Sequence, residues 1–283
     1  MGAMPPLIEK LLQYVSEDIG FGDITTEALV EDDIITNAEV ISKESCVIAG
    51  ISIISSLFTA SGCKVKKFVK DGQWVTNKQK ILHITGTAIT ILQLERTSLN
   101  LIGRMSGIAT DTRTYVEKIE NAGLKTRIAS TRKTAPGLSQ LDKAAVKMGG
   151  GDTHRLRLDD AIMIKDNHMK LVGSVAEALE KAKSTVSFTK KMEIEVSSLE
   201  EAIEAAQSGV DIIMLDNMSP RQVDGVISEL KNRGLRNSVI LESSGRINLE
   251  NLIDYAKTGI DVVSIGALTH SSRSVDLSLE LVR

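Results

Sequence analysis

The second half of this 283-residue chain repeats one pattern, in which a short apolar segment is followed by an amphipathic one. The apolar segments predict strands near residues 125–130, 161–165, 192–196, 211–215, 238–242 and 261–265. Helical periodicity lies between most of them, at residues 138–147, 175–183, 199–207, 222–232 and 249–257. Gly209, Gly234 and Gly259 follow three of these helices, where a C-terminal cap belongs. Alternating strands and helices build parallel βα units.

Six such repeats lack the GxGxxG pattern of dinucleotide-binding folds, which favours an open or incomplete α/β barrel over a doubly wound sheet. The first half differs. Residues 36–42, 65–69 and 81–85 predict strands, and residues 7–16 and 51–61 predict helices. Residues 89–121 predict a long helix that is interrupted near Gly103 and Gly107.

Composition excludes several classes of protein. The net charge of −3 argues against general nucleic-acid binding, and no apolar run reaches the roughly 18 residues that a membrane span needs. The N-terminus lacks a basic region followed by an apolar one, as a signal peptide would have. Cys46 and Cys63 form no CxxC pair, so we expect reduced thiols and a cytoplasmic protein.

Positive charge is concentrated in residues 127–170, which hold nine of the 34 basic residues but only five of the 37 acidic ones. This stretch therefore carries +4 in a protein that is acidic elsewhere. Three consecutive glycines, Gly149 to Gly151, free its backbone to turn sharply or to approach a ligand closely. The alternative is a solvated charged face, but there the charges would alternate with apolar residues along each strand. We expect an anion-binding site.

Polar groups end or follow each predicted strand, where α/β barrels carry their chemistry. Arginine and lysine suit carboxylates and phosphates, and these are Arg132, Lys133, Arg155 and Lys165. Carboxylates suit Mg²⁺, and the candidates are Glu195, on the same strand face as Glu193, and Asp216. Backbone N–H groups can cradle phosphate in the loops opened by Ser244-Gly245 and Gly266-Ala267. The predicted site therefore binds a polyanion together with Mg²⁺.

Structural alternatives stay open for several of these residues. Glu195 and Asp216 can instead neutralise Lys133 and Lys165 inside the barrel. His154 can form a surface pair with Arg155. The other residues with an open alternative are His168, which can cap a loop or act directly, His270, which can be structural, and Arg96, which can be an exposed helix charge.

Ten sequence blocks resemble quinolinate phosphoribosyltransferase, a decarboxylating enzyme, in order and spacing over nearly the whole chain. They include LERTSLNLIGRMSGIAT, STRKTAPGL, AVKMGGGDTHR, AIMIKDNH, EIEV, IMLDN and LESSG. The resemblance implies an N-terminal α/β sandwich, residues 1–109, joined by the C-terminal segment 270–283 with the last helix of the chain. Residues 110–269 would form an open α/β barrel. It also implies a homodimer, or an assembly of dimers, with sites shared between subunits.

The family's site residues carry over motif by motif. The resemblance implies that quinolinate is bound by Arg132, His154, Arg155 and Lys165, with Arg96 from the neighbouring subunit. The phosphates of phosphoribosyl pyrophosphate would contact Lys133, Ser244, Gly245, Gly266 and His270. Glu195 and Asp216 would face the ribose and Mg²⁺, directly or through water. The implied product is nicotinate mononucleotide, formed with loss of CO₂ in NAD biosynthesis. Arg104 and Arg157 add charge and have no assigned role.

Three other readings compete with this one. Lys165, at a strand end beside an aspartate, would suit a Schiff-base aldolase. A non-catalytic sensor of phosphorylated metabolites would bind the same anions without turnover. The molybdenum-operon relative called ModD shares the architecture, but it tends to depart from the GGGDxHR and IKDNH blocks that are intact here.

Overall fold

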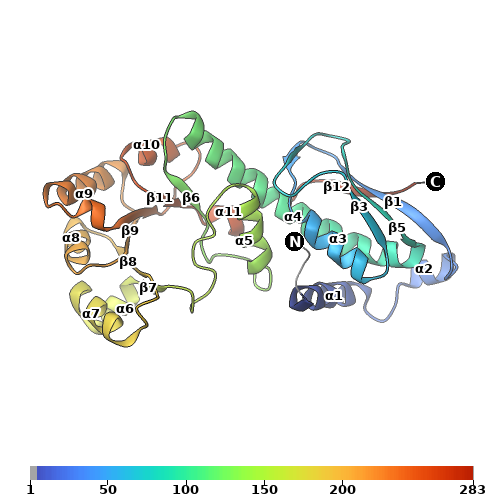
Figure 1. Cartoon of the computed structure of the whole chain (residues 1–283), viewed down its shortest axis with the longest axis horizontal. Coiled ribbons are helices and arrows are strands. Elements are labelled where there is room, and N and C mark those ends of the chain that lie inside the picture. The colour runs from blue at the N-terminus through green and yellow to red at the C-terminus, as the bar shows by residue number, and fades with distance from the viewer. Residues whose placement is uncertain (1–4, 283) are drawn as a thin grey trace. The chain divides into compact units, whose positions relative to one another are not determined.

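The computed structural model describes residues 5–282, in two compact units (Figure 1). One unit comprises the chain up to residue 111 together with residues 147–150 and those from 272 onward. The other comprises residues 112–146 and 151–271. The predicted division kept residues 147–150 in the barrel, whereas the structure groups them with the first unit.

The first unit is built on an antiparallel sheet of order β12-β1-β5-β3. Its strands are β1 (Ile35–Ser42), β3 (Lys64–Lys67), β5 (Lys80–Thr87) and β12 (Leu277–Val282). A separate two-stranded sheet pairs β2 (Cys46–Val47) with β4 (Trp74–Val75). The helices are α1 (Pro5–Ile19), α2 (Ile24–Leu29), α3 (Ile51–Ala60) and the first part of α4 (Ala88–Asn121). The Asp71 carboxylate caps α3 by accepting backbone N–H groups at its start.

The expectation that a helix ends the chain is wrong, because the last element is the strand β12. Its apolar residues alternate with polar ones, which is the period of a half-buried strand. Leu277, Leu279 and Leu281 lie opposite residues 42, 40 and 38 of β1, in antiparallel register. The C-terminal segment therefore completes the first unit as an edge strand.

The predicted interruption of the long helix is also wrong, because α4 runs unbroken for 34 residues. Its glycines serve close packing instead. A Cβ atom at Gly103 would lie 2.7 Å from Ser274 Oγ and 2.9 Å from Val275 O, and one at Gly107 would collide with the carbonyl of Arg273. The segment before β12 therefore crosses α4 at its two glycines, where the helix carries no side chains to keep the two backbones apart.

Replacing Gly107 with alanine should lower the stability of the first unit by about 1–3 kcal/mol, since the added methyl group forces backbone to move. Gly225, on helix α9, is the matched control, because a Cβ there meets nothing within 4 Å. Gly225→Ala should be neutral or stabilising by up to about 1 kcal/mol. Thermal unfolding of the two variants measures the difference, and equal melting temperatures would contradict this account of Gly107.

The second unit is a six-stranded parallel sheet of order β6-β11-β10-β9-β8-β7, as the predicted open barrel requires. The strands are β6 (Arg127–Ala129), β7 (Ile162–Ile164), β8 (Met192–Val196), β9 (Ile212–Asp216), β10 (Ile240–Ser244) and β11 (Val262–Ser264). The helices are α5 (Ser139–Met148), α6 (Asp166–Val172), α7 (Val175–Thr185), α8 (Leu199–Gln207), α9 (Pro220–Asn232), α10 (Leu252–Lys257) and α11 (Ala267–His270), with the 3-10 turn η1 (Arg236–Ser238).

Local sequence explains where these helices begin and end. The side chains of Ser174, Ser198 and Ser219 accept backbone N–H groups at the starts of α7, α8 and α9. The predicted glycine caps are confirmed, because Gly209, Gly234 and Gly259 have φ values of +70°, +71° and +86°. The apolar faces of α7 to α10 share one buried core with the strands, on the outer side of the sheet (Figure 1).

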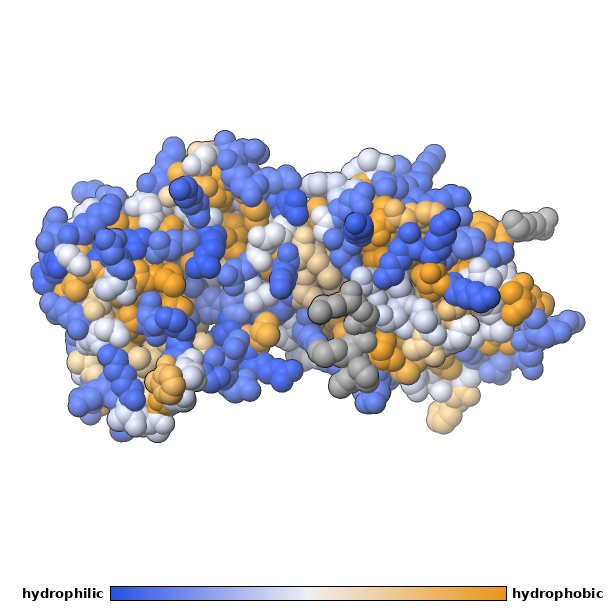
Figure 2. Space-filling model, in the orientation of Figure 1, coloured by the Kyte–Doolittle hydropathy of each residue, from blue (hydrophilic) through white to orange (hydrophobic). Residues whose placement is uncertain are grey.

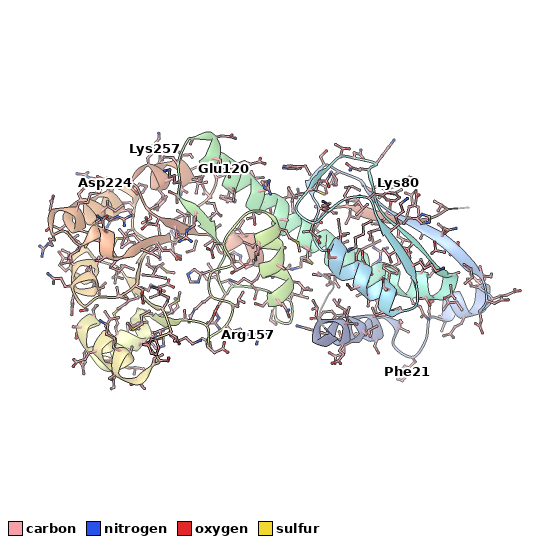
Figure 3. All side chains as sticks on the ribbon, viewed as in Figure 1. Phe21, Lys80, Glu120, Arg157, Asp224 and Lys257 are labelled. Carbon is pink, nitrogen blue, oxygen red and sulfur yellow. The ribbon has the colours of Figure 1, made fainter. Side chains whose placement is uncertain are left out.

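Within residues 5–282, no helix is both long and apolar enough to cross a membrane. Hydrophilic residues are spread over the face drawn in Figure 2, with apolar side chains in small groups among them. One exposed apolar group lies in residues 21–35, where Phe21 projects from the loop after α1 (Figure 3).

Candidate active site

The second unit contains a cavity of about 540 Å³ at the carboxyl ends of its strands. Most of the predicted site residues line it. They are Arg132, Lys133, His154, Arg155, Lys165, Glu195, Asp216, Ser244, Gly245, Gly266 and His270. The exception is Arg96, which lies on α4 in the first unit. Parallel strands bring these residues together because their carboxyl ends share one edge of the sheet.

Arg155 reaches the cavity from the loop between α5 and β7. Its two terminal nitrogens donate to protein acceptors, Nη1 to Ala161 O at 3.2 Å and Nη2 to Met163 Sδ at 3.3 Å. These contacts fix the plane of the guanidinium. Its Nε is buried and has no hydrogen-bond partner among the described residues. A buried donor of this kind costs free energy unless an acceptor arrives, and a carboxylate is the acceptor that a guanidinium binds best.

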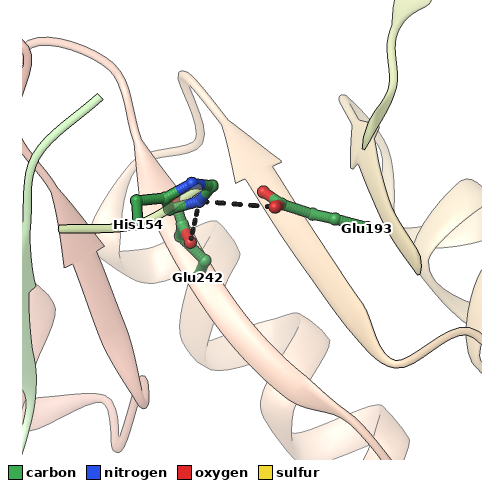
Figure 4. A group of neighbouring side chains, drawn as sticks. All are labelled: His154, Glu193 and Glu242. Atoms are coloured by element: carbon green, nitrogen blue, oxygen red, sulfur yellow. Dashed lines mark hydrogen bonds and ion pairs between the residues drawn. The ribbon is translucent and has the colours of Figure 1, made fainter. Parts of the chain in front are cut away.

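His154 lies beside two buried glutamates, Glu193 on β8 and Glu242 on β10, two strands with β9 between them (Figure 4). Its Nε2 is 3.3 Å from Glu193 Oε2 and 3.1 Å from Glu242 Oε2, and the glutamates are 1% and 2% exposed. Burial alone would lower the pKa of His154, but its hydrogen bonds to both carboxylates raise that pKa. Burial raises the pKa of Glu193. The three side chains form a tightly coupled buried cluster around the Nε2 atom of His154.

This histidine and its two glutamates have the composition of a metal site, since their ligand atoms lie within 4.8 Å of one another. The other ring nitrogen argues against that function. Arg155 N–H donates to His154 Nδ1 at 2.8 Å, so Nδ1 offers a lone pair and the ring proton resides on Nε2. A metal at Nε2 would need that proton on Nδ1. The cluster therefore holds a proton between Nε2 and the carboxylates.

The backbone of His154 is also unusual. Its φ is +53°, in the left-handed region that a non-glycine residue rarely adopts. Both ring nitrogens contact protein groups, so the ring anchors the loop and the backbone of Arg155. Direct contact between His154 and a substrate carboxylate stays a prediction.

Lys165 and Glu195 form an ion pair across the ends of β7 and β8. The Lys165 side chain is 42% exposed, and Glu195 lines the same cavity. The pairing that was an alternative to metal binding is thus formed in this structure. It also disfavours the aldolase reading, because a Schiff-base lysine is activated by an apolar pocket or a neighbouring cation.

Asp216 and Glu195 supply carboxylate oxygens from adjacent strands, and both line the cavity. Asn217 Nδ2 donates to Asp216 Oδ2 at 2.7 Å, which leaves the other carboxylate oxygen of Asp216 for a ligand. Hard oxygen donors of this kind fit Mg²⁺, which usually takes one or two protein carboxylates and completes its coordination with water and phosphate.

The loops after β10 and β11 bring backbone close to the cavity. Gly245 has a φ of +104°, and a Cβ there would collide with the side chain of Asn217. Only glycine fits that position. A Cβ at Gly266 would lie 3.2 Å from the ring of His270 and 3.3 Å from the side chain of Lys133. These two glycines therefore let the loops line the cavity with backbone.

The roles of three other charged residues differ from one another. His168 Nδ1 accepts the backbone N–H of Lys165 at 2.9 Å, so its side chain caps the start of α6. Arg157 is exposed in the loop between α5 and β7 (Figure 3) and lines a shallow depression outside the cavity with Leu156 and Asp159. Arg104 lies on α4.

Two features of this site were missed in the sequence. Glu242 was predicted as the last residue of its strand and was given no role, whereas β10 continues to Ser244 and Glu242 is buried within it. Helix α6, directly after β7, was not predicted. The alternation Glu193-Ile194-Glu195 did signal that two carboxylates face the same way, but it gave Glu193 no partner.

A cationic cavity at the carboxyl ends of a parallel α/β barrel defines an enzyme-type site for small anionic substrates. Two family models together match most of the chain. The model of the quinolinate phosphoribosyl transferase N-terminal domain matches residues 23–106, and that of the C-terminal domain matches residues 108–280. The chain belongs to the quinolinate phosphoribosyl transferase family.

Relatives of known name are similar over most of their length. A probable nicotinate-nucleotide pyrophosphorylase (carboxylating) of Methanothermobacter thermautotrophicus is 44% identical over 97% of this chain and 99% of its own. The human nicotinate-nucleotide pyrophosphorylase (carboxylating) is 37% identical over 85% of this chain and 80% of its own. The crystal structure of NadC from Streptococcus pyogenes is 36% identical, covers 100% of both chains and has a TM-score of 0.91.

Proposed function

We propose that this protein transfers the phosphoribosyl group of phosphoribosyl pyrophosphate to quinolinate. The products are nicotinate mononucleotide, pyrophosphate and CO₂, which places the reaction in NAD biosynthesis. The observation that carries the proposal is the cavity that gathers Arg132, Arg155 and Lys165 with the carboxylates of Glu195 and Asp216 and two glycine loops. Membership of the family over both units supports the same conclusion.

Quinolinate carries two adjacent carboxylates, and the cations of the cavity match them. Arg155 Nε offers a buried donor without a partner, and Arg132 and Lys165 line the same space. Nicotinate has one carboxylate fewer, so binding it would leave a cation of the site unpaired. We expect nicotinate to be a poor acceptor, by at least about a hundredfold in kcat/KM.

The phosphates of the second substrate fit the remaining residues of the cavity. Lys133, Ser244, Gly245, Gly266 and His270 are the residues that would contact them. Glu195 and Asp216 would hold Mg²⁺, directly or through water. When bound, Mg²⁺ supplies charge neutralisation for the pyrophosphate oxygens.

The chemistry begins when the pyridine nitrogen forms a bond to C1 of the ribose as the bond from C1 to pyrophosphate breaks. C1 gains positive charge in this transition state, and the carboxylate of Glu195 or Asp216 stabilises it electrostatically. Lys133 stabilises the negative charge that develops on the leaving pyrophosphate. The protein contributes positioning and preorganised charge.

Decarboxylation follows on the ribosylated ring. The positively charged ring nitrogen lets the ring accept the electron pair of the bond between C2 and its carboxylate. CO₂ leaves, and C2 takes up one proton to give nicotinate mononucleotide. Neither a Schiff base nor pyridoxal phosphate is needed.

A homodimer, or an assembly of dimers, with shared sites is part of the proposal. The side chain of Arg96 is 64% exposed and lies 3.7 Å from Glu95, so its guanidinium is accessible to a partner subunit. Exposed apolar side chains in residues 21–35 support an interface on the first unit. Cys46 and Cys63 are both free and buried, which fits a cytoplasmic setting.

The deciding experiment incubates the protein with quinolinate, phosphoribosyl pyrophosphate and Mg²⁺, and follows nicotinate mononucleotide and CO₂. We expect equal amounts of both products, loss of turnover with EDTA and recovery with excess Mg²⁺. Parallel reactions contain nicotinate or another aromatic acid in place of quinolinate. Turnover of another acid but not quinolinate would overturn the substrate assignment and favour the ModD reading. A borohydride-trapped adduct at Lys165 would favour the aldolase.

A further inference from the structure

Lys143 on α5 is a fully enclosed lysine that the proposed reaction does not use. It is 2% exposed and is one of the largest buried side chains in the described part of the chain. Its Nζ donates to the carbonyl oxygen of Thr153. Burying an ammonium group in such surroundings costs several kcal/mol unless the charge is paired and hydrogen-bonded.

The carbonyl of Thr153 belongs to the loop that carries His154 into the cavity. Ser130 Oγ donates to the same carbonyl at 3.1 Å, so two donors hold it. Asp152 continues the sheet beside β6, since Asp152 N donates to Ile128 O at 2.7 Å. Lys143 therefore braces the loop at the residue before the left-handed turn of the backbone.

Charges of both signs face Lys143. Burial contributes most to lowering the pKa of Lys143, from 10.5 to about 8. Asp152 raises that pKa, Arg132 and Arg155 lower it, and Asp142 raises it. The two arginines that repel the ammonium group are those that line the proposed quinolinate site.

We propose that Lys143 is a positioning residue that braces the loop of His154 and Arg155 and takes up a proton when a dicarboxylate binds to the cavity. This inference rests on the proposed function. A bound dianion offsets the charges of Arg132 and Arg155, so it removes repulsion that opposes protonation of Lys143. Proton uptake and ligand binding then favour each other, as linkage requires.

The sign of the pH dependence follows from this coupling. Well below pH 8, Lys143 is already protonated in the free protein, so ligand binding causes little proton uptake. As the pH rises through about 8, the free protein loses the proton while the complex keeps it. Affinity should therefore fall above this pH, and uptake should reach up to about half a proton per site at pH 8.

The test is calorimetric titration of the full chain with phthalate, which has two adjacent carboxylates but no ring nitrogen to react. Titrations at pH 7, 8 and 9 use buffers of different ionisation enthalpy, with and without phosphoribosyl pyrophosphate and Mg²⁺. Lys143→Arg keeps the charge at every pH, and Lys143→Met removes it. Lys147→Met, at an exposed lysine one turn further on α5, is the matched control.

We expect proton uptake in the unmodified protein and in Lys147→Met, and none in Lys143→Arg or Lys143→Met. Lys143→Met should bind phthalate about tenfold more weakly at pH 7, and Lys143→Arg should restore most of that loss. Uptake that persists in Lys143→Arg, or its absence in the unmodified protein despite binding, would overturn this inference alone. Failure of phthalate and quinolinate to bind under any of these conditions would overturn the proposed function as well. If Lys143→Met does not fold, the comparison with Lys143→Arg still decides.

Discussion

Replacing Arg155 with alanine should lower kcat/KM for quinolinate about 100- to 1000-fold. Losing one partner of a buried, charge-assisted contact costs about 2–5 kcal/mol, and each 1.4 kcal/mol is a factor of ten. The effect should fall on KM for quinolinate, because in the proposed assignment the guanidinium binds the substrate carboxylate before and after ribosylation. The protein contacts at Nη1 and Nη2 hold the group in place, and Nε is the donor that waits for an acceptor.

Steady-state kinetics of three variants tests this assignment. Arg155→Lys keeps a positive charge but loses the planar fork, so its loss should be intermediate. Arg157→Ala, two residues further in the same loop and exposed, should change kcat/KM less than about threefold. KM for phosphoribosyl pyrophosphate should change little in all three. Normal quinolinate KM in Arg155→Ala would contradict the carboxylate assignment.

The second large effect is expected on stability, from replacing His154 with alanine. The change removes the hydrogen-bond donor that Glu193 and Glu242 share and leaves two buried carboxylates facing each other. Breaking a buried ionic cluster in this way costs about 3–5 kcal/mol. We expect the melting temperature of the second unit to fall by roughly 10 °C.

Two further variants separate this explanation from a general effect of removing a ring. Adding Glu242→Gln to His154→Ala deletes one of the opposed charges and should recover a substantial part of the lost stability. His83→Ala is the control in the first unit, where the ring is 3.7 Å from Glu39 and only half buried, and it should cost less than about 1 kcal/mol. If the double variant is no more stable than His154→Ala, carboxylate repulsion is not the cause.

The sequence predicted much of the barrel because its signals are local. Apolar segments, amphipathic segments and glycine caps recur in order. Each of these signals predicts the structure of the few residues that carry it. The two errors in the first unit arise from contacts between distant segments. The glycines of α4 are explained by the chain around residues 273–275, and β12 is a strand because β1, more than 230 residues earlier, offers it an edge.

The same distinction holds for the site. The strand-end rule found the residues that line the cavity, such as Lys165 and Asp216. It did not identify the buried residues that support the cavity wall. The bond from His154 to Glu242 joins residues 88 positions apart, and the burial of Lys143 depends on how α5 packs under a loop. Neither leaves a periodic signal in the sequence.

The position of β12 has a consequence for how the chain folds during synthesis. The edge strand β12 of the first unit is synthesised after residues 112–271, so its sheet can be completed only after the whole barrel segment has been made. Residues 112–271 hold every strand of the parallel sheet and can pair as soon as they emerge. We therefore expect the usual N-to-C order of domain folding to be reversed here, with the N-terminal unit finishing after the barrel.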